Sequence, residues 1–109
     1  LSYVLISCQG YCALHRRGPK DIWQGLWEPC LFENEPLPDW QGTLTLLNSH
    51  VKHVLTHRII MADFYLLQTD VRPELPPDYI WVKQEDINCY AVPRLVELLF
   101  ESMEKKALL

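Results

Sequence analysis

The clearest pattern of hydrophobic and polar positions in the chain is a period of two that runs from residue 59 to residue 69. The even positions from 60 to 66 are all apolar: Ile60, Ala62, Phe64 and Leu66. The odd positions include the polar residues Asp63 and Thr69. Successive side chains of a strand point to opposite faces, so this alternation predicts a half-buried β-strand.

Other segments carry shorter versions of such patterns. Further strands are predicted at 2–7, 11–17, 26–32 and 79–83, and an extended stretch at 50–55. A helical period begins at Pro93, which suits the first position of a helix, and its apolar residues then recur every three or four positions. Asp39 is a suitable cap for a second, short helix through residue 47, although Gly42 is a poor helix former. These elements predict the α+β class, a mixed β-sheet with a C-terminal helix packed on it.

The size and composition of the chain indicate a small globular domain. It has 109 residues, of which 49% are hydrophobic and 11% aromatic, which excludes a disordered protein. No apolar run approaches the ~18 residues of a membrane-spanning helix, and the start shows no signal-peptide pattern. Because the chain begins with Leu1 and is strand-like at once, we expect one domain, residues 1–109, excised from a larger protein.

The net charge is −4, from 10 basic and 14 acidic residues, so the chain cannot coat DNA by charge alone. The charge is nevertheless uneven. Basic residues gather in "HRRGPK" at 15–20 and in "KHVLTHR" at 52–58, whereas acids dominate 28–39 and 70–86. The two basic segments are either a local positive patch or ordinary solvated surface, and composition alone favours solvated surface.

Cysteine and histidine are the residues to test for a metal site. The cysteines form neither a C-x-x-C pair nor an iron–sulfur pattern, so we expect free thiols: Cys8, Cys12, Cys30 and Cys89. Three histidines are spaced three and four apart, as metal ligands on a helix would be: His50, His53 and His57. Their neighbours favour an extended chain, in which residues 50 and 53 point to opposite sides. We therefore predict no metal site, and no catalytic residue, because no Ser-His-Asp set has a motif around it.

The stretch "WQGLWE", residues 23–28, is similar to the start of the Nudix motif, which often reads Gly-Leu-Trp-Glu-Phe-Pro. Four residues match, from Gly25 to Glu28, and Pro29 follows without the aromatic residue. An active Nudix hydrolase then needs two glycines and a helix with paired glutamates that hold magnesium against a diphosphate. This chain has only Glu33 and Glu35, in a segment interrupted by proline. The magnesium-binding sequence is absent.

Over nearly all of its length the chain resembles the C-terminal domain of the adenine DNA glycosylase MutY family. The resemblance is carried by "LHRRGPKDIWQGLWEP", "VKHVLTHRIIMADFYLL" and "YAVPRLVELL", in this order. It implies a Nudix-like fold that recognises 8-oxoguanine opposite a mispaired adenine. The implied partners are double-stranded DNA with that mispair and the N-terminal catalytic domain of the same protein. The resemblance places the iron–sulfur cluster in that other domain, with no cofactor in this one, and implies a bacterial cytoplasmic, nucleoid-associated protein.

In the MutY family a loop that reads Phe-Ser-His reaches the 8-oxoguanine, and the matching residues here are Leu55, Thr56 and His57. The hydroxyl of Thr56 can donate and accept hydrogen bonds, as Ser would. Leu55 is expected to wedge into a base step, and His57 and Arg58 to meet a base edge or a phosphate. Residues for further phosphate contacts are Arg16, Arg17, Lys20 and Lys52. Without the resemblance, Thr56 is interpreted as a turn hydroxyl, Leu55 as core and His57 as surface.

The predicted function is therefore recognition of a DNA lesion by a domain without catalysis of its own, within a protein expected to be an adenine DNA glycosylase. Two alternatives from other classes stay open. One is a nucleotide pyrophosphohydrolase of the Nudix class, which a magnesium-binding glutamate helix would indicate. The other is a non-catalytic protein-interaction domain, which an absence of lesion-dependent DNA binding would indicate.

Overall fold

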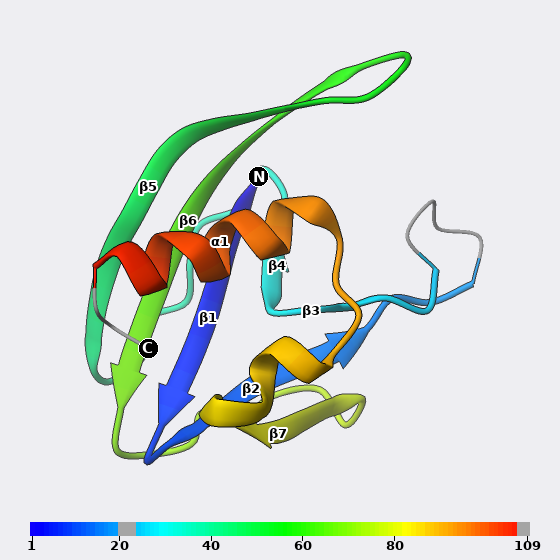
Figure 1. Ribbon diagram of the computed structural model, residues 1–109. Coiled ribbons are helices and arrows are strands. Elements are labelled where there is room, and N and C mark those ends of the chain that lie inside the picture. Colours follow the sequence, from blue (N-terminus) through cyan, green and yellow to red (C-terminus); the bar gives the residue numbers. More distant parts are fainter. Residues whose placement is uncertain (20–23, 107–109) are drawn as a thin grey trace.

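The computed structural model describes residues 1–19 and 24–106, which form a mixed β-sheet with one α-helix across one face (Figure 1). The strands are β1 (Ser2–Cys8), β2 (Tyr11–Arg16), β3 (Trp27–Glu28), β4 (Cys30–Phe32), β5 (Thr43–Val54), β6 (Ile59–Thr69) and β7 (Tyr79–Lys83). The helices are the 3-10 helix η1 (Gln84–Cys89) and the α-helix α1 (Arg94–Lys105). The predicted fold class is confirmed. No helix in these residues is long and apolar enough to cross a membrane.

Strand β1 lies at the centre of the sheet. It pairs in parallel with β6 on one side, and antiparallel with β2 and β4 on the other. Strand β5 pairs antiparallel with β6 at one edge, and β2 also pairs with β3 and β7. Four successive residues of β1, from Tyr3 to Ile6, are fully buried, as a strand with both faces covered requires.

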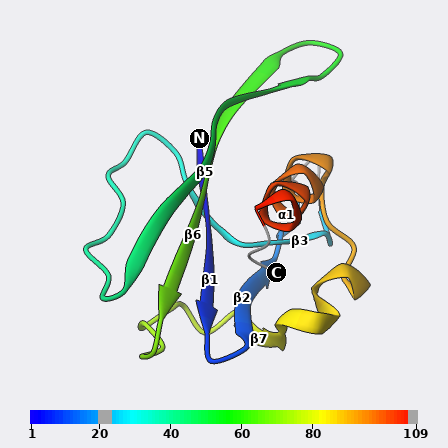
Figure 2. The ribbon, with the colours of Figure 1, turned by 60° about the vertical axis from the view of Figure 1, so that its left-hand side comes forward.

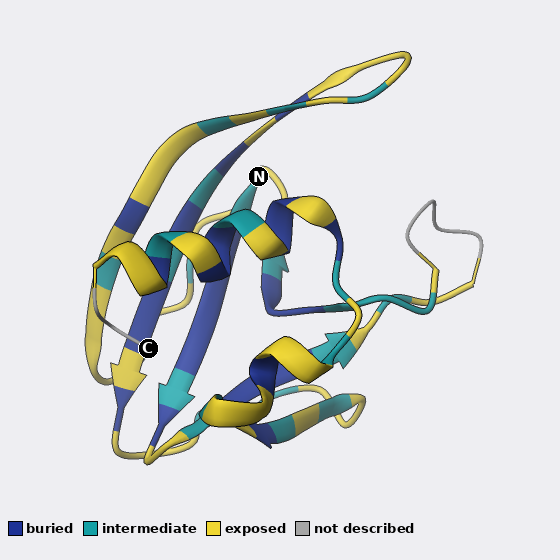
Figure 3. Cartoon of the chain, in the orientation of Figure 1, coloured by how far each residue is buried: buried dark blue, intermediate teal, exposed yellow. Residues whose placement is uncertain are grey.

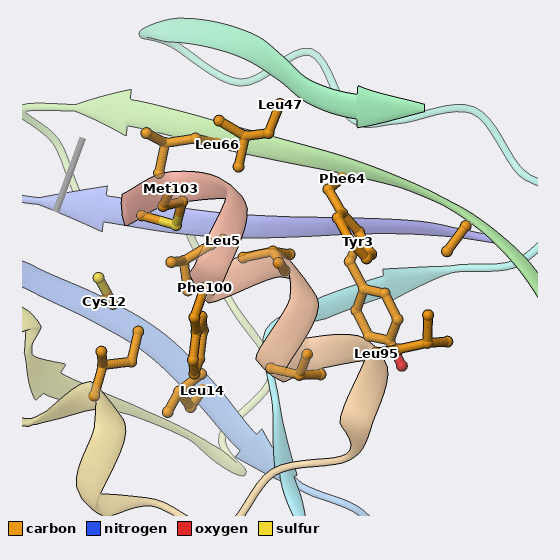
Figure 4. Close-up of a cluster of buried hydrophobic side chains, with 14 of the residues drawn as sticks. Tyr3, Leu5, Cys12, Leu14, Leu47, Phe64, Leu66, Leu95, Phe100 and Met103 are labelled. Carbon is orange, nitrogen blue, oxygen red and sulfur yellow. The ribbon is translucent and has the colours of Figure 1, made fainter. Parts of the chain in front are cut away.

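The main core lies between the sheet and α1 (Figure 4). The sheet contributes Tyr3 and Phe64, whose ring centroids lie 6.5 Å apart. The helix contributes the predicted apolar stripe, which is buried: Leu95, Val96, Leu99, Phe100 and Met103. Pro93 is the cap residue, one position before the helix, and its carbonyl accepts hydrogen bonds from the backbone N–H groups of Val96 and Glu97.

A second apolar cluster covers the opposite face of the sheet. The loop between β4 and β5 lies on that side, away from α1 (Figure 2), and packs Leu37 and Trp40 against it. Strand β6 contributes Leu67 to this cluster, and Thr69 is also buried. The prediction of a half-buried strand is therefore wrong for the end of β6, which is covered on both faces.

The predicted bounds of β6 and β7 are confirmed, and the segment 26–32 is divided into β3 and β4 at Pro29. The predicted helix between residues 39 and 47 is wrong, because β5 begins at Thr43. Gly42 has a φ of +123°, and a Cβ there would lie 2.4 Å from the carbonyl oxygen of Gln68. This close approach places Thr43 opposite Gln68 in the sheet, and such long-range pairing outweighs a local capping signal.

Candidate nucleic-acid interface

The far end of the β5–β6 hairpin extends beyond the rest of the domain (Figure 1). Its last strand pair is Val54 with Ile59. Beyond that pair, the backbone N–H of Leu55 donates a 2.8 Å hydrogen bond to the carbonyl of Arg58. This bond leaves Thr56 and His57 as the two residues of the tip.

The four residues that the sequence assigned to lesion recognition are therefore gathered in one tight turn. Thr56, His57 and Arg58 are exposed at its end (Figure 3), so their polar groups are accessible to a partner. Leu55 differs from them, because it is half-buried and packs against the main core. Its side chain serves the fold, and its predicted role as a wedge stays a prediction.

A double irregularity in β5 sets the direction of the hairpin. The pairing with β6 shifts register between Leu46 and Asn48 and again between Asn48 and Val51. Within it, His50 has a left-handed φ of 55°, and its backbone N–H donates a 2.9 Å hydrogen bond to Oδ1 of Asp63. Bulges bend a strand and change the direction of the residues beyond them. The sequence pattern did not reveal them, although the Asn48–Ser49–His50 run is a turn-like signal inside a strand.

The hairpin is cationic although the chain as a whole is acidic. No Asp or Glu occurs between Asp39 and Asp63 in the sequence, and the exposed cations Lys52 and Arg58 both lie in this interval. A positive, projecting element with a hydroxyl and an imidazole at its tip can donate hydrogen bonds to base edges and neutralise phosphates.

The other basic segment, at residues 15–20, is arranged differently. Nη1 of Arg17 lies 2.5 Å from Oε1 of Glu28, and the Arg17 side chain is only 13% exposed, so Arg17 has a structural partner. Arg16 is exposed, and its Nε donates a 3.0 Å hydrogen bond to the carbonyl of Gly25. Lys20 lies outside the described residues. Phosphate contacts by these residues stay predictions.

Glu28 is the centre of a buried polar cluster that the sequence pattern did not predict. It is 2% exposed, and it accepts a 3.1 Å hydrogen bond from the hydroxyl of Tyr3. His15 Nε2 lies 2.9 Å from its second oxygen. The signal for this cluster in the sequence was an acidic residue among the apolar residues of β3 and β4. Close by, burial raises the pKa of Tyr79 and raises the pKa of the Cys30 thiol to about 11, so both groups are neutral at pH 7.

Glu33 and Glu35 do not form the magnesium site of a hydrolase. Both are exposed, and they lie in the loop that follows β4 rather than on a helix. Within residues 1–19 and 24–106, no three or more His, Cys, Asp or Glu side chains are gathered so that they could hold a metal ion.

The family model of the NUDIX domain matches residues 2–102. The chain belongs to the NUDIX domain family. The solved structures that resemble this Nudix domain include the following two. The C-terminal domain of mouse MUTYH, crystallised in complex with human PCNA, has a TM-score of 0.72 and 20% sequence identity, covering 97% of this chain and 87% of that one. A Nudix hydrolase from M. smegmatis, RenU, has a TM-score of 0.62 and 12% identity, covering 97% and 83%.

No curated protein matches this Nudix domain at a significant level. The two structural matches share too few residues to show more than a common fold. The predicted Nudix-like fold is confirmed by them and by the family match.

Proposed function

We propose that this domain recognises 8-oxoguanine in double-stranded DNA, as the lesion-reading part of an adenine DNA glycosylase. The observation that carries the proposal is the tip of the β5–β6 hairpin, where Thr56, His57 and Arg58 are exposed together in a stretch, residues 40–62, that contains no acid. The sequence resemblance to MutY supports it, as does the shared fold with the C-terminal domain of mouse MUTYH.

The chemistry of the lesion suits the tip. Guanine presents N7 as an acceptor in the major groove, whereas 8-oxoguanine carries a proton on N7 and an oxygen on C8. The hydroxyl of Thr56 can accept from N7–H or donate to the C8 oxygen. His57 offers a second donor, and the exposed cations Lys52 and Arg58 would contact phosphates.

The proposal assigns no catalysis to this domain. Glu33 and Glu35 are solvated acids in a loop, and the resemblance assigns the catalytic carboxylates and the iron–sulfur cluster to an N-terminal domain. That domain is the proposed second partner of this one.

The test is the Thr56→Ala, His57→Ala double variant, titrated with duplexes that carry adenine opposite 8-oxoguanine or opposite guanine. Wild-type binding is expected near the non-specific range of ~10⁻⁴ to 10⁻⁶ M, because the domain has few cations. The double variant should lose the preference for the lesion by roughly tenfold or more, since each hydrogen bond to a base edge contributes to discrimination. Its stability should change by no more than about 0.5 kcal/mol, because both side chains are exposed.

Thr43→Ala is the matched control, because Thr43 is an exposed hydroxyl residue at the opposite end of β5. It should leave the preference unchanged. A double variant that keeps the wild-type preference would refute the proposal, and one that melts well below wild type would assign the tip a structural role.

A protein partner is the second candidate, because the mouse MUTYH domain was crystallised in complex with human PCNA. A second titration, with PCNA in place of DNA, separates the two functions. Binding to PCNA, together with DNA binding that ignores the lesion, would favour a protein-interaction domain.

A further inference from the structure

The hairpin carries three exposed aliphatic or thioether side chains near its tip. Val54 is 64% exposed, Ile59 57% and Met61 44%. We call these three residues the hairpin strip. Exposed apolar residues that adjoin one another commonly mark a binding surface, whereas scattered ones need no explanation.

Strand pairing places the three residues of the hairpin strip on one face. Val54 lies directly opposite Ile59, and Met61 lies opposite Lys52 on the next step of the same face. The intervening residue Ile60 is buried in the main core, and Leu55 packs against that core, so the strip points to the other side of the hairpin. The pair nearest the tip, Val54 and Ile59, is therefore apolar and open to solvent.

The charges around the strip indicate the kind of partner that covers it. Lys52 lies opposite Met61 and Arg58 precedes Ile59, while Glu33 lines the same pocket as Arg58 and Ile59. An apolar surface with two cations beside it complements DNA, whose phosphates bear the charge and whose unstacked bases are apolar. The end of the hairpin also projects beyond the rest of the domain, where a partner can reach it (Figure 1).

We propose that Val54 and Ile59 form the wedge that opens the base step beside the lesion, in place of Leu55. This inference rests on the proposed function and deepens it. Leu55 would have to leave its packing against the main core to enter a base step, whereas Val54 and Ile59 are exposed already. Both are β-branched, so each has few rotamers to lose on contact, and the paired strands hold them side by side.

The test uses the Val54→Thr, Ile59→Thr double variant. Threonine keeps the β-branch and the strand preference but replaces a methyl or ethyl group by a hydroxyl. The matched control is Leu44→Thr, Leu46→Thr. It changes two exposed apolar residues of the same hairpin near the start of β5, away from the tip. The probe is a duplex with adenine opposite 8-oxoguanine and 2-aminopurine beside the lesion, because 2-aminopurine fluorescence rises when the base is unstacked.

Wild-type protein and the Leu44, Leu46 control should raise the fluorescence, and the Val54, Ile59 variant should lose most of the rise. Its affinity should fall by about tenfold, because contact by an aliphatic side chain of this size contributes at least such a factor. The salt dependence of its binding should stay as in wild type, since no phosphate contact is removed.

Three outcomes overturn the inference. Unstacking that survives in the Val54, Ile59 variant, or is lost instead in Leu55→Ala, shows that these two residues are not the wedge. Lesion-specific binding by wild type without any unstacking refutes the wedge but keeps the proposed function. Wild-type binding that does not distinguish 8-oxoguanine from guanine refutes the proposed function as well.

Discussion

Replacing Glu28 by Gln should destabilise the domain strongly, although the change removes only one charge. The carboxylate is almost inaccessible to water. It pairs with the Arg17 guanidinium, accepts a hydrogen bond from the Tyr3 hydroxyl and lies beside His15. Gln keeps the size of the side chain and one acceptor oxygen, so packing is preserved. The change removes the negative charge that faces the Arg17 guanidinium, whose side chain is 13% exposed.

Removing one partner of a buried ion pair costs about 3–5 kcal/mol, because the remaining charge is not compensated. The partial exposure of Arg17 and of His15, at 13% and 18%, argues for the lower end, ~3 kcal/mol. Domains of this size are stable by about 5–15 kcal/mol, so a large share of the stability is at risk.

The assay is equilibrium unfolding in urea, with the midpoint and slope fitted for each variant. The control is Glu97→Gln, which breaks the exposed pair between Arg94 and Glu97 and should cost 0 to about 1 kcal/mol. The reasoning is refuted if Glu28→Gln and Glu97→Gln lower the free energy of unfolding by equal amounts, because burial would then make no difference to the pair.

Further predictions concern glycine and cysteine. Gly42→Ala should lower the urea midpoint more than Gly10→Ala, because both residues have positive φ but only at Gly42 does a Cβ meet the backbone, 2.4 Å from the Gln68 carbonyl oxygen. An equal loss in both variants would contradict this. Cys89, which is exposed, should react with a thiol reagent in the native protein, whereas buried Cys12 and Cys30 should react only after unfolding. Burial raises the pKa of the Cys30 thiol from its ordinary 9.0 to about 11, so its stabilising contribution is complete below pH 9 and is lost as the pH rises toward 11. Cys30→Ala should therefore flatten the decline in the free energy of unfolding over that interval, and an unchanged decline would contradict the assignment.

Local hydrophobic patterns predicted the elements in which buried residues recur at a regular spacing. The bounds of β6 followed from a period of two, and the helix α1 followed from the apolar stripe after Pro93. The tip of the hairpin was also predictable, because its polar residues directly precede the apolar face of β6. These features depend on neighbours in the sequence.

The remaining features depend on residues that are distant in the sequence. The sequence at the start of strand β5 has a local helix signal, the Asp39 cap. It is nevertheless a strand, because it pairs with β6 and because Gly42 approaches Gln68 closely. The partner of Arg17 was hidden for the same reason, since Glu28 reaches it only when β2 pairs with β3. The exposed apolar face of the hairpin could not be predicted, because the sequence does not show which side of the hairpin packs against the core through Leu55.

The parallel pairing of β1 with β6 has a consequence for the order in which the domain folds. Strand β1 is the first of these strands to leave the ribosome, yet the neighbour that completes its pairing comes from the second half of the chain. The β5–β6 hairpin, by contrast, joins strands that follow one another, so its loop-closure entropy is small. Contacts between distant segments form late and slow the folding of a chain. The β1–β2 and β5–β6 hairpins can therefore each assemble early, and the edge of β1 that pairs with β6 stays open until the β5–β6 hairpin arrives.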